Sequence, residues 1–402
     1  MKVTITPGKP TGRVMAPPSK SMAHRMLMGA GLAAGTSVVD NIDLSEDIKA
    51  TLGILEALGG EYTIQERKVI MRGVGSKKLQ TNKILDSKES GSTLRFFIPL
   101  VLTAGEKCEF TGAKRLFERP LGIYEDSCKT QGIRFEKGET GLKVDGQLRA
   151  AHYKVPGNIS SQFITGLLFA LPLLKEDSVL EVLPPIESKA YIDMTLQALG
   201  IFGIQIKQDG NIFYIAGNQN YEAKDVTVEG DYSNAAFLDA FNLIGGDVQV
   251  EGLRDDSLQG DQIYQKYYQV LKEDDSILDI AECPDLGPIL MGMAAACKGA
   301  KFTGTRRLRI KESDRGAVMA EELAKFGIPV DVMENEIIVH AGTLKAPSTI
   351  LSSHNDHRIA MTMATLCTIT GGTIEGAESV KKSFPSYFEV IESVGIKVAR
   401  EG

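Results

Sequence analysis

The chain has no tryptophan, and its few cysteines are not spaced as metal ligands or as redox pairs. The cysteines are odd in number and form no Cys-x-x-Cys pair, which excludes the common zinc and dithiol motifs. We therefore expect a reducing, cytoplasmic location, mostly buried thiols and no bound metal. The five positions are Cys108, Cys128, Cys283, Cys297 and Cys367.

Excess positive charge and long apolar runs are missing too. The 45 Lys and Arg residues against 52 Asp and Glu residues give a net charge of −7, which argues against a general binder of nucleic acid or anionic membranes. No apolar run is long enough to span a membrane. The start of the chain has neither the apolar core of a signal peptide nor the Arg and Ser content of a transit peptide. We expect no nucleic-acid and no membrane partner, so any basic site must be local.

The stretch Ala16–Gly35 lacks the glycines of a Walker-type phosphate loop, but it joins a polar loop to an apolar helix. Two prolines keep the backbone extended, so the helix cannot begin before about Ser19. Its start carries Lys20, Ser21 and Arg25 beside unpaired backbone N–H groups. This combination suits a phosphate or carboxylate, although a serine N-cap with solvated charges gives the same pattern.

Similar helices recur along the chain, each apolar nearly all round and each preceded by a polar cluster. Counted from Ser21, the steps between their starts are 71, 69, 72, 52 and 71 residues, so six units share the 402 residues and one unit is abbreviated. A helix that is apolar on every face is buried, so sheets must surround these helices. The later starts are near Ser92, Ser161, Ser233, Asp285 and Asp356.

A second feature recurs between these helices: an amphipathic helix that ends in glycine, followed by two short strands around a polar turn. Five copies are clear, and the sixth, near residue 270, has lost its glycine. Each unit therefore reads strand, apolar helix, strand, amphipathic helix, strand, strand. The most polar gap, at residues 217–225, leaves three units on each side and is the predicted interdomain crossing.

Polar clusters at the helix starts in the first half suit anion binding. Gly91 allows close backbone approach near Arg95, Arg119 precedes a proline, and two hydroxyls and an amide stand at residues 160–162. Taken one by one, each could equally be an ordinary cap or a solvated charge.

The second half adds carboxylates to the cations. Asp285 opens one apolar helix, Glu312 lies in an alternating-charge segment, and Arg358 stands at the start of a helix whose first turn must face a cavity or cleft. Together the clusters suit a ligand or ligands with several negative charges and proton transfer between them. The cations are Lys20, Arg25, Arg119, Arg315, Arg358 and Lys382.

With these residues in view, the chain closely resembles the 5-enolpyruvylshikimate-3-phosphate synthase family nearly end to end. The resemblance implies two domains that close like a jaw, each an inside-out α/β barrel of three β-α-β-α-β-β repeats around buried helices. It also places the first strand with the C-terminal half, so the expected domains are residues 16–226 and residues 1–15 with 227–402. The matching motifs are Ser19-Lys20-Ser21 with Arg25, Gly91 to Arg95, Glu118-Arg119-Pro120, Ser160-Ser161-Gln162, Ser188 with Tyr191-Ile192-Asp193, Pro284-Asp285, Lys311 to Arg315, Asp356-His357-Arg358 and Lys382-Ser383-Phe384-Pro385.

The resemblance further implies transfer of the enolpyruvyl group of phosphoenolpyruvate to the 5-hydroxyl of shikimate 3-phosphate, without a metal or organic cofactor. We also expect the protein to be a monomer. Asp285 would deprotonate the hydroxyl, and Glu312, helped by Lys20, would handle the methylene proton. The implied shikimate 3-phosphate ligands are Lys20, Ser21, Arg25, Ser160, Ser161, Gln162, Ser188, Asp285 and Lys311. The implied phosphoenolpyruvate ligands are Lys20, Gly91, Arg119, Gln162, Arg315, Arg358 and Lys382.

Two residues depart from the family pattern, and three competing functions stay open. Glu89 and Arg307 stand where asparagine is frequent in the family, so neither is included in the site, and sensitivity to the inhibitor glyphosate is undecided. UDP-N-acetylglucosamine enolpyruvyl transferase shares the fold but uses a loop cysteine shortly before an Arg-Pro, whereas Cys108 is eleven residues before Arg119 and in an expected strand. The second competing function is that of a nucleotide-using RNA 3′-phosphate cyclase, and the third is non-catalytic sensing of phosphometabolites.

Overall fold

The computed structural model describes residues 1–75 and 77–401, and these residues form two compact units. Unit 2 consists of residues 20–229, and unit 1 combines residues 1–19 with 230–402. The sequence predicted a crossing at residues 217–225, and the family resemblance implied domain bounds at residues 16 and 227. Each unit has its own hydrophobic core.

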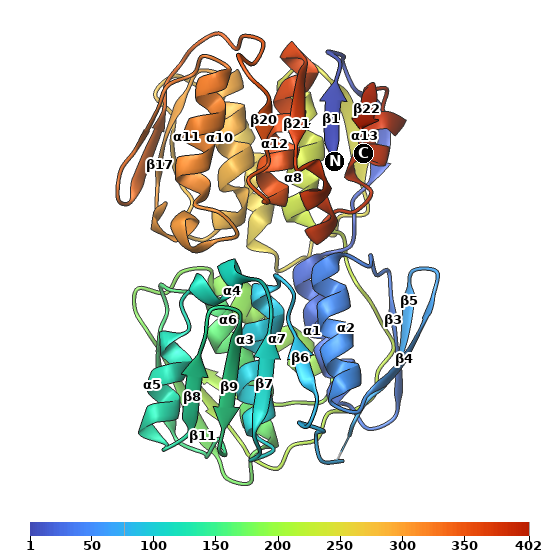
Figure 1. Ribbon diagram of the computed structural model, residues 1–402, viewed down its shortest axis with the longest axis vertical. Coiled ribbons are helices and arrows are strands. Elements are labelled where there is room, and N and C mark those ends of the chain that lie inside the picture. Colours follow the sequence, from blue (N-terminus) through green and yellow to red (C-terminus); the bar gives the residue numbers. More distant parts are fainter. Residues whose placement is uncertain (76, 402) are drawn as a thin grey trace. The chain divides into compact units, whose positions relative to one another are not determined.

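Unit 2 is built from three sheets with one strand order, as the repeats predict (Figure 1). In each sheet the first two strands run parallel, and the remaining pairs are antiparallel. In order across the sheets, the strands are β14 (Val226–Thr227), β3 (Thr36–Asp40), β5 (Lys68–Arg72) and β4 (Glu61–Gln65); β6 (Ile84–Asp86), β7 (Cys108–Thr111), β9 (Gly141–Asp145) and β8 (Arg134–Lys137); β10 (His152–Pro156), β11 (Ser178–Leu183), β13 (Ile212–Ile215) and β12 (Ile206–Asp209).

Unit 1 repeats this order twice and abbreviates it once. The short unit has two parallel strands and no hairpin after its amphipathic helix, which accounts for the step of 52 residues. The strands in sheet order are β2 (Thr11–Met15) and β15 (Asp247–Glu251); β16 (Ile277–Asp279), β17 (Ala300–Thr303), β19 (Glu336–Val339) and β18 (Val330–Val332); β20 (Leu351–Ser352), β21 (Gly372–Glu375), β1 (Lys2–Ile5) and β22 (Val398–Glu401).

The first strand of the chain completes the last sheet of unit 1. Lys2–Ile5 pairs antiparallel with β21 on one side and β22 on the other. In the same way, β14 at the end of unit 2 supplies the first strand of the sheet that contains β3. In each unit, one sheet is therefore completed by a strand that lies far from the other strands of that sheet in the sequence.

The six apolar helices lie in the cores, as their composition predicts. In α10, for example, nine of ten residues are buried. In unit 1, α8, α10 and α12 pack on one another, and in unit 2 α3 packs on α6. The six are α1 (Lys20–Leu32), α3 (Gly91–Leu102), α6 (Ser161–Ala170), α8 (Tyr232–Leu243), α10 (Gly287–Ala296) and α12 (His357–Thr370).

The amphipathic helices and short 3-10 turns connect the strands around these cores. The helices are α2 (Glu46–Ala57), α4 (Lys114–Glu118), α5 (Gly122–Thr130), α7 (Lys189–Ile201), α9 (Tyr264–Val270), α11 (Arg315–Lys325) and α13 (Tyr387–Ser393). The turns are η1 (Leu171–Leu173), η2 (Gly260–Ile263), η3 (Pro284–Leu286), η4 (Arg306–Ile310) and η5 (Ala377–Lys382). Among the helices of the described residues, none has the length and hydrophobicity needed to cross a membrane.

Candidate active site

In unit 2, Lys20 and Arg25 stand at the start of α1 in different electrostatic surroundings. Lys20 Nζ lies 2.8 Å from a carboxylate oxygen of Asp47, at the start of α2. Arg25 is buried and donates to the hydroxyls of Thr195 (2.9 Å) and Thr165 (3.3 Å). These hydroxyls are neutral, and burial lowers the Arg25 pKa only to about 10. Arg25 therefore keeps its positive charge at neutral pH, which favours an anion nearby.

The same guanidinium also fixes its own position on the backbone. Arg25 donates to the carbonyl oxygens of Ser21 (2.7 Å) and Tyr191 (2.9 Å), so it ties α1 to α7. Ser188, the N-cap of α7, is fully buried and has a left-handed backbone with φ of 59°. The structure thus brings Ser21, Arg25 and the start of α7 together, as the resemblance implied.

A chain of buried hydroxyls links the starts of α1, α2 and α3. His24 Nδ1 lies 2.8 Å from Thr51 Oγ1, Thr51 lies 2.8 Å from Thr93 Oγ1, and Thr93 donates to Ser90 Oγ at 2.7 Å. Burial, with the charges of Lys20 and Arg25 adding to it, holds the pKa of His24 well below its usual range. His24 is therefore neutral at pH 7 and acts as a structural link.

The starts of α3 and α6 face each other through an amide. Gln162 Nε2 donates to Ser92 Oγ at 2.9 Å, and Gln162 Oε1 accepts from Arg95 Nη1 at 2.6 Å. Ser160 caps α6, with its Oγ 3.4 Å from the N–H of Gln162. Arg95 and Ser92 thus orient Gln162, a contact between residues 67 and 70 positions apart that the sequence alone did not indicate.

Gly91 lies against the guanidinium of Arg119. A Cβ on Gly91 would come within 2.6 Å of Arg119 Nη1, so only glycine leaves this guanidinium in place. Arg119 is buried and directly follows α4. The structure therefore brings together Gly91, Arg119 and, through Ser92, Gln162, three of the residues expected for phosphoenolpyruvate.

In unit 1, the carboxylate of Asp285 is surrounded by cations. Its Oδ1 accepts from Lys311 Nζ at 3.0 Å and from Arg315 Nη1 at 2.9 Å, and its Oδ2 lies 3.6 Å from Arg358 Nη2. Burial opposes ionisation, but Lys311, Arg358 and Arg315 together hold the Asp285 pKa well below its usual range. Asp285 is therefore ionised at neutral pH.

The same environment disfavours the charged form of Lys311, whereas it favours the charged form of Asp285. Burial, with the charges of Arg315 and Arg307 adding to it, lowers the pKa of Lys311 to about 8, although Asp285 acts in the opposite direction. Arg307 is buried on η4 and donates to the carbonyl oxygen of Ala281 at 3.3 Å. This arginine, left out of the predicted site, thus contributes charge to the cluster.

Arg315 holds three carboxylates of unit 1 together. It is 1% exposed, and it contacts Asp356 Oδ2 (2.9 Å) and Glu312 Oε2 (2.8 Å) as well as Asp285. Burial opposes its charge, but the carboxylates raise the Arg315 pKa above its usual value. Asp285 and Glu312, the predicted base and acid, are thus bonded to one permanently charged group.

Arg358 and Lys382 are the other two cations of unit 1 that the sequence predicted for the site. Arg358 is 5% exposed, and its Nε and Nη1 have no hydrogen-bond partner among the described residues. Its backbone N–H donates to Asp356, the N-cap of α12. Lys382, at the end of η5, donates to the carbonyl oxygen of Asn355 at 2.5 Å. A buried guanidinium with two unused donor atoms is an arrangement that a bound anion satisfies.

Both units have repeated α/β structure with buried cations at helix starts, and this arrangement suits small molecules that carry several negative charges. Comparison with known proteins identifies the family. Residues 5–391 match the family model for EPSP synthase (3-phosphoshikimate 1-carboxyvinyltransferase), and the chain belongs to this family.

Individual relatives agree with this membership. The chain is 40% identical to the 3-phosphoshikimate 1-carboxyvinyltransferase of Clostridium kluyveri, over 98% of this chain and 97% of the relative. It is 39% identical to the enzyme of the same name from Clostridium perfringens strain ATCC 13124, over 98% of both chains. The solved structure of EPSP synthase from Acinetobacter baumannii matches with a TM-score of 0.79 and 25% identity, over 99% of this chain and 100% of that chain.

Proposed function

We propose a role for each of these residues in carboxyvinyl transfer. Carboxyvinyl transfer is the activity of the family to which this chain belongs. The enolpyruvyl group passes from phosphoenolpyruvate to the 5-hydroxyl of shikimate 3-phosphate, and phosphate leaves. The observation that carries the assignment is the carboxylate of Asp285, held ionised by Lys311, Arg315 and Arg358.

Addition and elimination together require proton transfer at three atoms. A proton is added to the methylene carbon of phosphoenolpyruvate while the 5-hydroxyl loses its proton and its oxygen bonds to the neighbouring carbon, giving a tetrahedral ketal phosphate. The new methyl group then loses a proton as the carbon–oxygen bond to phosphate breaks. These steps need proton transfer but no oxidant or reductant, so we propose no cofactor. Asp285 takes the hydroxyl proton, and Glu312 with Lys20 serves the methylene carbon.

Substrate binding converts Asp285 into a better base. Lys311, Arg358 and Arg315 hold its pKa well below the usual range, so it is a weak proton acceptor in this arrangement. Phosphate and carboxylate groups of the substrates compete for Lys311 and Arg358. As these cations turn to the substrates, the Asp285 pKa rises toward the range that general-base catalysis needs.

The ligand sets follow the expected division. We propose that shikimate 3-phosphate is bound by Lys20, Ser21, Arg25, Ser160, Ser161, Gln162, Ser188, Asp285 and Lys311. We propose that phosphoenolpyruvate is bound by Lys20, Gly91, Arg119, Gln162, Arg315, Arg358 and Lys382. The charge of Arg25 and the two unused donor atoms of Arg358 support these assignments.

A UDP-N-acetylglucosamine enolpyruvyl transferase would need a reactive loop cysteine, and Cys108 does not fit that role. Cys108 is 1% exposed in β7, and burial raises its pKa to about 12. Such a thiol is protonated and inaccessible at neutral pH, so it is not a loop nucleophile.

The test measures phosphate release from phosphoenolpyruvate with each acceptor, for the wild-type chain and for Asp285→Asn. We expect release with shikimate 3-phosphate only, and a loss of kcat in the variant of roughly 10²- to 10⁴-fold. Release with neither acceptor would reject catalysis and leave a phosphometabolite sensor. An active Asp285→Asn protein would reject the role of the carboxylate.

We also propose that the protein acts in the cytoplasm and as a monomer. The state of its cysteines supports a reducing compartment, because all five are free thiols and four of them are buried. Light scattering after gel filtration tests the monomer, which should give the mass of one chain.

A further inference from the structure

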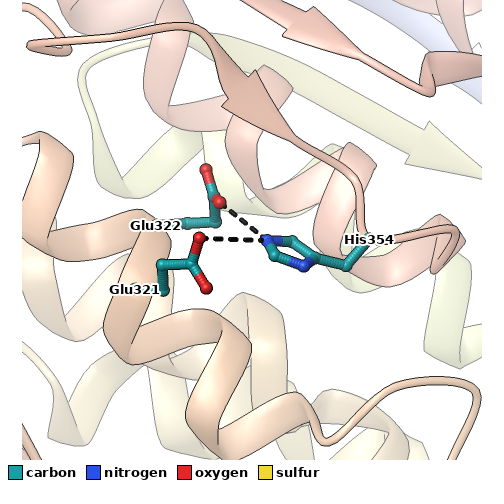
Figure 2. A group of neighbouring side chains, drawn as sticks. All are labelled: Glu321, Glu322 and His354. Carbon is teal, nitrogen blue, oxygen red and sulfur yellow. Dashed lines mark hydrogen bonds and ion pairs between the residues drawn. The ribbon is translucent and has the colours of Figure 1, made fainter.

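Glu321 and Glu322 on α11 and His354 before α12 lie close together in unit 1 (Figure 2). Glu322 is fully buried, whereas Glu321 is 60% exposed on its side chain. His354 Nε2 lies 2.8 Å from Glu322 Oε1 and 3.8 Å from Glu321 Oε1. A carboxylate only accepts hydrogen bonds, so Nε2 carries the hydrogen.

This cluster is an internal hydrogen-bond network rather than a metal site. Lys325 Nζ lies 2.7 Å and 3.0 Å from the two carboxylate oxygens of Glu322, and the N–H of Ser352 donates to Oε2 at 3.0 Å. A divalent cation would have to displace this ammonium group. Lys325 also donates to the carbonyl oxygen of Ile350 at 3.2 Å, so the network holds residues 350–354 against α11.

The segment held in this way has a strained turn. His354 and Asn355 are consecutive non-glycine residues with left-handed backbones, φ 48° and 56°. Such conformations are strained and persist only where surrounding contacts fix them. The hydrogen bond that the His354 ring donates to Glu322 is one of these contacts.

The strained turn leads directly to two cations of the site. The carbonyl oxygen of Asn355 accepts from Lys382, and the next residue, Asp356, caps α12 and receives the N–H of Arg358. α11 therefore contacts this segment at two points. Its first residue, Arg315, pairs with Asp356, and Glu322, two turns further along α11, contacts His354.

We propose that Glu322 and His354 are positioning residues for phosphoenolpyruvate, because they hold the turn that places Lys382 and Arg358. They act through the backbone of Asn355 and Asp356 and do not touch the substrate. The proposal rests on the assignment of Lys382 and Arg358 to phosphoenolpyruvate made above.

The test compares His354→Ala with His354→Gln in the full-length chain. Both substitutions place an ordinary side chain at a left-handed position, so the backbone cost is similar. Only glutamine keeps an N–H donor near the place of Nε2. For His354→Ala we expect the KM for phosphoenolpyruvate to rise about tenfold, since a hydrogen bond to a buried charge is lost. Glutamine should restore most of this loss.

The affinity for shikimate 3-phosphate alone, measured by titration without phosphoenolpyruvate, should stay within about twofold of wild type in both variants. The matched control is His340→Ala, which removes an exposed histidine–carboxylate contact of 2.7 Å with Asp331. It should change neither the KM for phosphoenolpyruvate nor the affinity for shikimate 3-phosphate.

An unchanged KM for phosphoenolpyruvate in His354→Ala overturns the proposal. So does an equal loss of affinity for both substrates, which would indicate general damage to unit 1. An inactive wild-type chain would instead count against the function proposed above.

Discussion

Among single residues, Lys311 sets the pH at which the unit 1 cluster changes charge, because burial lowers its pKa against the opposing effect of Asp285. Lys311 has a pKa of about 8, so its ammonium group loses its proton as the pH rises through this value. The charged form is the one that binds a phosphate. We therefore expect the affinity for shikimate 3-phosphate to fall above pH 8, as measured by calorimetric titration between pH 6.5 and 9.5.

Two variants test whether Lys311 is the group that titrates. Asp285 raises the pKa of Lys311, so Asp285→Asn should move the fall in affinity to lower pH. Lys311→Arg, with a guanidinium that stays charged, should remove the fall over this range. A fall that is the same in all three proteins would assign the titration to another group.

Gly91 lies so close to Arg119 that a larger side chain should disturb the binding of phosphoenolpyruvate. In Gly91→Ala the new Cβ would lie 2.6 Å from Arg119 Nη1, so this guanidinium must move. We expect a KM for phosphoenolpyruvate raised about tenfold or more, with a smaller change in kcat, because one binding contact is displaced. Gly122→Ala is the control, since nothing lies within 4 Å of its added Cβ. Equal steady-state constants in both variants would contradict the proposed contact.

Among the elements, the close approach of α6 to α3 depends on Gly166. A Cβ there would lie 2.4 Å from the carbonyl oxygen of Arg95 and 2.4 Å from Tyr124 Oη. Since backbone cannot move aside as a flexible side chain does, Gly166→Ala should lower the free energy of unfolding by about 2–3 kcal/mol. Denaturant titration measures this loss.

Gly200 in α7 provides the matched control for that substitution. Its added Cβ meets nothing within 4 Å, so Gly200→Ala should stabilise the protein by about 0.5–1 kcal/mol through helix propensity. If both variants were stabilised, α3 and α6 would not be in the contact described.

For the molecule as a whole, the first strand ties the start of the chain to its end. Val3 and Ile5 are buried in the sheet between β21 and β22. Val3→Asp places an unpaired charge in the core of unit 1, with an expected loss of about 3–5 kcal/mol. Hydrogen exchange should show lost protection in residues 230–402 and retained protection in residues 36–215.

Lys2→Gln, on the exposed side of the same strand, serves as the control and should leave exchange unchanged. Loss of protection that spreads equally through both units in Val3→Asp would show that they do not unfold separately.

Much of this architecture could be predicted from the sequence because hydrophobic periodicity is local. The abbreviated unit was expected from the step of 52 residues and is the two-stranded sheet of β2 and β15. The place of β1 came only from the family resemblance, since nothing in Lys2–Ile5 specifies partners near the other end of the chain. The cationic helix starts of the site were predicted from the sequence. The pairing of Lys20 with Asp47, the contact of Arg95 with Gln162 and the hydrogen-bond network of Glu322 were not.

The sequence by itself determined where the buried helices begin and which of them carry cations, because burial patterns and N-terminal caps are properties of short segments. Only the tertiary structure decided which charges meet. Lys20 pairs with Asp47 across 27 residues, His354 with Glu322 across 32, and Arg315 with Asp356 across 41. Each pairing depends on how separate helices pack. The resulting charge states, above all the ionised Asp285 and the weakly basic Lys311, are therefore products of the fold.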